Sequence, residues 1–123
     1  MHSRTACTNR FLIAALLSMS AGIAAPALGQ VINEDLKLMA SDGESGDMFG
    51  CSIAIDNGVI AVGAFRGGSC LDNVLGAVYL FDASTGIQIA KLEPDDCPAG
   101  NAFGSSVDIQ DGIVAVGMSR YLD

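Results

Sequence analysis

The sequence predicts an all-β protein made of four-stranded antiparallel sheets. Two segments, 37–68 and 91–122, align without gaps at an offset of 54 residues, with 13 identities in 32 pairs. Inside each copy, short runs of β-branched residues alternate with turn residues, which indicates strands rather than helices. A repeated unit of four short strands is typical of a β-propeller blade. We therefore expect an incomplete propeller of about two blades, the second of them truncated.

The first hairpin of each unit is predicted by its turn residues. Asn57-Gly58 separates the runs 52–55 and 59–62, and Asp111-Gly112 takes the same place in the second copy. Both residues of such a two-residue turn need positive φ, which Asn, Asp and Gly tolerate best.

A second hairpin joins the segments 76–81 and 86–92 through Asp82–Thr85. Longer loops, 64–75 and 93–102, connect the hairpins. If the strands run up and down, both long loops lie at one end of the sheets and the tight turns lie at the other.

Residues 1–29 predict a secretory signal helix. They contain no acidic residue, hold Arg4 and Arg10, and carry an apolar run at 11–17 followed by small residues. An uncleaved membrane anchor is the alternative, but a spanning helix needs ~20 apolar residues, and Ser18, Ser20 and Pro26 interrupt this run. We expect cleavage near Gly29 and an extracellular or periplasmic propeller domain at 30–123 that is not bound to a membrane.

The charge of residues 30–123 excludes several classes of function. Four basic and 14 acidic residues leave a net charge of −10, which disfavours nucleic acid as a partner. The one histidine, His2, precedes this segment, so Ser-His-Asp catalysis and imidazole zinc sites are excluded there. We therefore expect no enzymatic activity in this chain.

Two in-register motifs resemble the FG-GAP repeat, which builds the β-propeller of integrin α-chains and occurs in bacterial secreted proteins. The motif residues in this sequence are Phe49, Gly50, Ser52 and Gly63 in the first copy, and Phe103, Gly104, Ser106 and Gly117 in the second. The resemblance implies a non-catalytic binding or scaffold module for protein or glycan interaction or adhesion. The alternative is the propeller portion of a larger exported enzyme whose catalytic domain lies beyond Asp123.

The resemblance also implies roles for the motif residues. Phe49 and Phe103 are expected to pack between neighbouring sheets, and the glycine after each allows close backbone approach. In integrin-like repeats a calcium loop lies between the Phe-Gly and Val-Gly strands, but here only tight turns occupy that place. Calcium needs six to eight oxygen ligands, so we expect no cofactor.

Three cysteines follow the signal segment: Cys51, Cys70 and Cys97. Cys70 and Cys97 fall in the two long loops, which share one end of the sheets, so export favours a Cys70–Cys97 disulfide. Cys51 is then expected to be a free, buried thiol. A zinc site is disfavoured because no two of the three cysteines are close in sequence.

Acidic residues concentrate at the predicted long-loop end. They are Asp42, Glu44, Asp47, Asp72, Glu93, Asp95 and Asp96. Asp72, Asp95 and Asp96 form the candidate binding face for a macromolecule, and a solvated surface that keeps the protein soluble is the alternative.

Propellers close with four to eight blades. The remaining blades are therefore expected either in a longer chain or in oligomer partners. The segment Leu36–Met39 matches the last strand of a unit and is a candidate for closing the ring.

Overall fold

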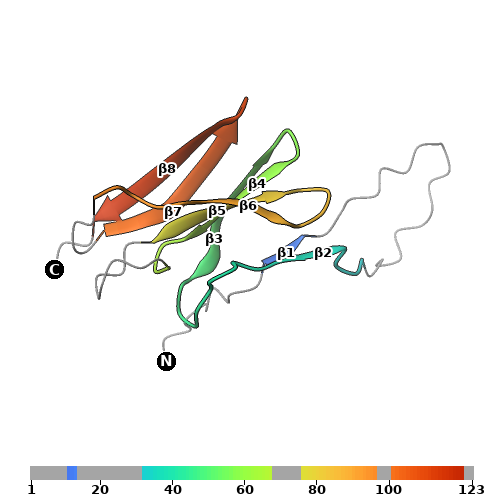
Figure 1. The fold of residues 1–123 in the computed structure, drawn as a ribbon, viewed down its shortest axis with the longest axis horizontal. Helices are drawn as coiled ribbons and strands as arrows, with labels where there is room; N and C mark the ends of the chain where they lie inside the picture. The colour runs from blue at the N-terminus through green and yellow to red at the C-terminus, as the bar shows by residue number, and fades with distance from the viewer. Residues whose placement is uncertain (1–10, 14–31, 68–75, 97–100, 121–123) are drawn as a thin grey trace, which may run out of the picture.

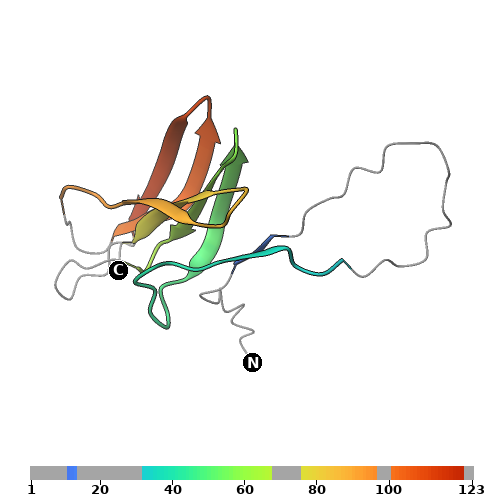
Figure 2. The same cartoon turned by 45° about the vertical axis from the view of Figure 1, so that its right-hand side comes forward.

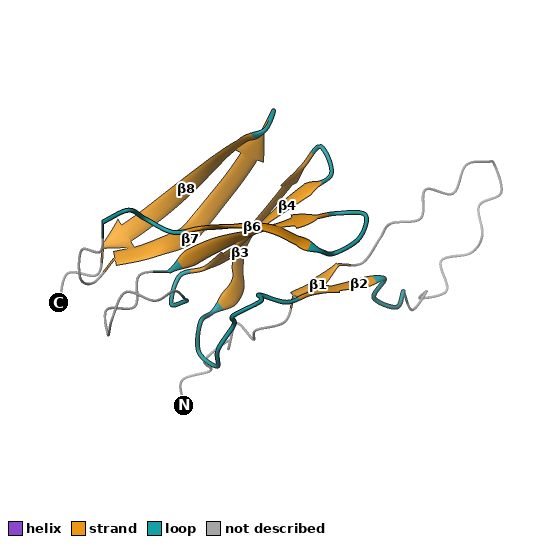
Figure 3. Ribbon diagram, in the orientation of Figure 1, coloured by secondary structure: helices purple, strands orange, loops and turns teal. Residues whose placement is uncertain are grey.

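The computed structural model describes residues 11–13, 32–67, 76–96 and 101–120, and every regular element in them is a β-strand (Figures 1 and 3). The strands are β1 (Phe11–Ile13), β2 (Leu36–Leu38), β3 (Phe49–Asp56), β4 (Val59–Ala64), β5 (Ala77–Asp82), β6 (Gln88–Leu92), β7 (Asn101–Gln110) and β8 (Ile113–Arg120). They form a four-stranded sheet, β3-β4-β5-β6, and two two-stranded sheets, β1-β2 and β7-β8. All pairings are antiparallel, which confirms the predicted all-β class. The described segments include no helix long and apolar enough to cross a membrane.

The two predicted tight hairpins are confirmed. Asn57 and Gly58 have φ of 46° and 76°, and Asp111 and Gly112 have φ of 50° and 78°. Positive φ at both central residues gives the turn twist that matches the right-handed twist of the flanking strands.

The turn between β5 and β6 is held by one carboxylate. The Asp82 side chain accepts hydrogen bonds from the backbone N–H groups of Ser84 at 2.8 Å and Thr85 at 2.9 Å. A hydrogen bond from the Ser84 hydroxyl is the first cause of a lowered Asp82 pKa. The Ala83 N–H donates to the Gly58 carbonyl at 2.8 Å, so both turns lie at one end of the sheet, as predicted.

The core lies on one face of the four-stranded sheet. Phe49, Tyr79 and Phe81 are almost wholly buried there, with the Phe49 ring centroid 5.7 Å from that of Tyr79 and 6.0 Å from that of Phe81. Both ring pairs are edge-to-face, a geometry that adds about 0.5–1.5 kcal/mol beyond the buried area. Leu38 of β2 completes this cluster, so β2 covers part of this face.

The β7-β8 hairpin packs on the opposite face, against β3 and β4 and to a lesser extent β5. Figures 1 and 2 both show the four-stranded sheet between β7-β8 on one side and β1-β2 on the other. The chain therefore stacks one complete blade and the first half of a second one.

The N-terminal region is described only in part. Within the predicted signal segment 1–29, Phe11–Ile13 form β1, which pairs with β2, and the other residues lie outside the described ranges. The segment proposed to close the ring thus has β1 as its strand partner in this structure.

Candidate binding face

The junction between the two stacked sheets contains the Phe-Gly and Val-Gly motifs. A Cβ atom on Gly63 would overlap both the Ser52 hydroxyl oxygen and the Gly104 carbonyl oxygen. A Cβ atom on Gly76 would overlap the Phe103 carbonyl oxygen. Glycine is therefore required at these positions because the backbones of the two sheets are in direct contact.

A serine links the two sheets by a hydrogen bond. The Ser52 hydroxyl donates to the Gly104 carbonyl at 2.6 Å. Gly104 has φ of 83° and follows Phe103 in a bulge of β7, which turns this carbonyl out of the β7-β8 ladder. Gly50 has φ of 87° in the matching bulge of β3.

The two phenylalanines have different surroundings. Phe49 is 1% exposed inside the core cluster, whereas Phe103 is half-buried. Ser106 and Gly117 occupy the same positions in the second sheet as Ser52 and Gly63, and a Cβ atom on Gly117 would overlap the Ser106 hydroxyl. Ser106 is exposed, whereas Ser52 is half-buried.

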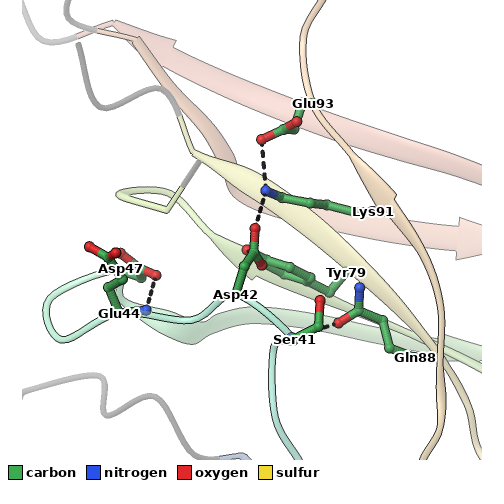
Figure 4. A network of polar contacts seen from close by, with 8 residues as sticks. All are labelled: Ser41, Asp42, Glu44, Asp47, Tyr79, Gln88, Lys91 and Glu93. Carbon is green, nitrogen blue, oxygen red and sulfur yellow. Dashed lines mark hydrogen bonds and ion pairs between the residues drawn. The ribbon is translucent and has the colours of Figure 1, made fainter. Parts of the chain in front are cut away.

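The end of the sheets opposite the tight turns gathers acidic residues from separate segments. The loop 40–48 runs beside the end of β6, and the Arg66 N–H donates to the Asp47 carbonyl at 3.1 Å. The Asp47 carboxylate accepts from the Glu44 N–H at 2.7 Å, which shapes this loop (Figure 4).

Lys91 is the centre of a charged network at this end (Figure 4). Its ammonium lies 2.6 Å from an Asp42 oxygen and 2.8 Å from a Glu93 oxygen. It also lies 5.6 Å from the centroid of the Tyr79 ring, within cation–π range. The Tyr79 hydroxyl donates to the other Asp42 oxygen at 2.9 Å, so Asp42 holds the loop against β5 and β6.

The network shifts three pKa values. The pKa of Asp42 is lowered, first because Lys91 donates a hydrogen bond to its carboxylate. Burial and the bond to Asp42 raise the pKa of Tyr79, which stays protonated. Burial lowers the pKa of Lys91, but its hydrogen bonds to Asp42 and Glu93 outweigh burial and raise the pKa overall.

The candidate binding residues are described in part. Asp95 and Asp96 follow β6, and both are exposed. Asp72 lies outside the described residues. Asp42 and Glu93 are exposed as well, but both share Lys91, so their charges are partly neutralised within the protein.

The cysteine prediction needs one correction. Cys51 is disulfide-bonded, so the expectation of a free thiol is wrong. A buried thiol was expected, but Cys51 is only half-buried near the start of β3. Its partner is one of the cysteines outside the described residues, which are Cys7, Cys70 and Cys97, and the Cys70–Cys97 pair stays a prediction.

Metal ligands do not gather in the part of the chain that the structure describes. No group of three or more His, Cys, Asp or Glu side chains has a metal-binding arrangement there.

The sequence did not predict that Lys91 and Tyr79 bind Asp42 at this end of the sheets. The repeat marked both residue types, because a lysine and an aspartate recur at matching positions of the two copies. Lys37 matches Lys91, and Asp42 matches Asp96. An ion pair between Asp42 and Lys91 spans 49 residues, and only the fold shows that the two residues meet.

Comparison with known proteins supports the repeat assignment. A family model for the FG-GAP repeat matches residues 32–81, which cover β2 to β4 and most of β5. The search of curated proteins found no match, and the search of solved structures found none either.

Proposed function

This chain is an FG-GAP repeat protein, and from that premise we propose that it is a secreted, non-catalytic binding and scaffold module. The stacked sheets serve as a rigid support, and the loop end carries the binding face. The ligand is a macromolecule with a basic surface, and a protein fits this description better than a neutral glycan.

The observation that carries this proposal is the division of acidic residues at the loop end. All four of these acids are exposed, but Asp42 and Glu93 pair with Lys91, and the Asp42 pair holds the loop 40–48 in place. Asp95 and Asp96 form no ion pair with a residue that the structure describes. A face that keeps its shape through an internal network loses little conformational entropy on binding. Two adjacent exposed carboxylates on such a face attract basic side chains and speed association.

Binding to a panel of immobilised extracellular proteins and glycans tests the proposal. The variant Asp95→Asn/Asp96→Asn is expected to bind its protein ligand at least about tenfold more weakly and to lose the salt dependence of association. Isosteric amides preserve size, so a change in affinity reports charge.

A matched control makes the same change in charge elsewhere. Asp35 and Asp111 are exposed and lie near the tight-turn end, because Leu36 contacts the β5-β6 turn at Gly86. Asp35→Asn/Asp111→Asn is expected to retain wild-type affinity. Equal losses in both double variants, or no binding to any protein of the panel, would overturn the proposal.

A further inference from the structure

The turn between β3 and β4 contains a pair of residues that can react with each other, Asn57 and Gly58. Of the asparagines in the sequence, only Asn57 is followed by glycine. Both residues are exposed at the tip of the hairpin. A Cβ atom on Gly58 would meet no heavy atom within 4 Å apart from its chain neighbours, so other parts of the described chain do not shield this position.

The reacting groups are not held by hydrogen bonds to the residues that the structure describes. The Asn57 amide makes none, and the Gly58 N–H donates none. The Gly58 carbonyl, by contrast, accepts a hydrogen bond from the Ala83 N–H at 2.8 Å. Because glycine has no side chain, its backbone nitrogen is also open to close approach by another group.

We propose that Asn57 is a site of spontaneous deamidation. The Gly58 nitrogen loses its proton to a base in solution and forms a bond to the side-chain carbonyl carbon of Asn57. The bond from this carbon to the amide nitrogen breaks, the amide nitrogen takes up a proton and leaves as ammonia, and a cyclic succinimide remains. Water then adds to either succinimide carbonyl and opens the ring, which leaves aspartate or isoaspartate at position 57.

The two products differ in how they fit the turn. Asp111 takes the place of Asn57 in the second copy, with φ of 50° against 46°, so aspartate fits a turn of this shape. Isoaspartate continues the chain through its side-chain carbon, which lengthens the backbone of the turn by one methylene group. Since the turn sets the register of a hairpin, this product disturbs the pairing of Asp56 with Val59 at the end of the ladder.

Either product also adds a negative charge where two carboxylates already lie. The Asp56 carboxylate accepts a hydrogen bond from the Asp111 N–H at 2.8 Å, so the two tight turns are side by side. A third carboxylate at position 57 repels both. This end of the sheets is opposite to the candidate binding face, so the reaction and the proposed binding are separate properties of the chain.

Incubation of the full, folded chain at neutral and at mildly alkaline pH tests the proposal. Peptide mapping by mass spectrometry is expected to show conversion of the Asn57 amide to an acid, with the aspartate and isoaspartate peptides separated by chromatography against synthetic standards. Conversion is expected to be faster at the higher pH, because the deprotonated nitrogen attacks. Asn33 is the internal control, since it is exposed but precedes Glu34, whose side chain hinders attack, and it is expected to stay unmodified.

The matched variant is Asn57→Gly, because glycine accepts positive φ and has no side-chain amide. During the same incubation the urea midpoint of the wild type is expected to fall as isoaspartate accumulates, whereas that of Asn57→Gly is expected to stay constant. Asn57→Asp is expected to have the wild-type midpoint before incubation, because Asp111 occupies the matching turn.

Two results would overturn the proposal. One is an Asn57 amide that stays intact in the folded chain while it converts in the urea-unfolded chain. The other is conversion of Asn33 as fast as that of Asn57. A fall in the urea midpoint that Asn57→Gly shares would contradict the effect assigned to isoaspartate in this turn.

Discussion

Replacing Gly63 with alanine tests whether backbone contact holds the two sheets together. The new methyl group would overlap the Ser52 hydroxyl oxygen and the Gly104 carbonyl oxygen. A side chain can rotate away, but the Gly104 carbonyl belongs to the backbone of the other sheet. The methyl group therefore fits only if β7 moves away from β4, and that movement also breaks the 2.6 Å hydrogen bond from Ser52 to Gly104.

Two costs determine the size of the effect. Inserting a methyl group into a packed interface costs roughly 1–3 kcal/mol. Losing a partly buried hydrogen bond costs ~1 kcal/mol more. The free energy of unfolding is thus expected to fall by about 3 kcal/mol, which for a domain of this size lowers Tm by more than ~10 °C.

The matched control is Gly117→Ala, which changes the same repeat position in the second sheet. There the nearest atom to the new methyl group is the Ser106 hydroxyl oxygen, and the Ser106 carbonyl oxygen is 3.6 Å away. Rotation of one exposed serine relieves the overlap, so the expected loss is below ~1 kcal/mol. Urea unfolding followed by circular dichroism measures both losses. Equal losses in the two variants would refute the reasoning.

Three further predictions concern the network, the turn and the disulfide. The folded-state pKa of Asp42 is lowered, so the ionised carboxylate contributes to the free energy of unfolding. This contribution is fully present above the unfolded-state pKa of about 3.9 and is lost as pH falls through the folded-state pKa. The urea midpoint of Lys91→Met should therefore lie below that of the wild type at pH 5, and the difference between the two midpoints should shrink when pH is lowered to about 2. A difference that does not change with pH would argue against the ion pair. Gly58→Ala places a Cβ at φ of 76° in a two-residue turn, so the free energy of unfolding is expected to fall by about 1–2 kcal/mol. A urea midpoint equal to that of the wild type would contradict this. Peptide mapping by mass spectrometry without reductant should recover Cys51 in a disulfide-linked peptide, and alkylation of Cys51 before reduction would contradict the structure.

Local chemistry explains what could be predicted from the sequence. The hairpins at Asn57-Gly58 and Asp111-Gly112 follow from the positive φ that a two-residue turn demands. The offset of 54 residues places matching strands in matching sheets, so the repeat alone indicates the blade architecture. These features depend on neighbours in sequence and need no knowledge of long-range contacts.

The candidate site could be predicted only in outline. Sequence reasoning placed Asp42, Glu93 and Asp95 at one end of the sheets, because the connections of an up-and-down sheet alternate between its ends. It did not separate the acids that pair with Lys91 from the acids that do not. That distinction depends on Lys91, which comes within 2.6 Å of Asp42 only when the loop folds onto β6.

The amino-acid sequence by itself determined the strand content, the tight turns and the repeated unit, since each follows from backbone preferences over a few residues. Only the tertiary structure decided which side of each sheet is covered. Ile55 and Ile109 have the same residue type and the same repeat position, yet one is exposed and the other is buried. The physical reason is that burial depends on what lies opposite a side chain, and for β3 and β7 the opposite surfaces differ.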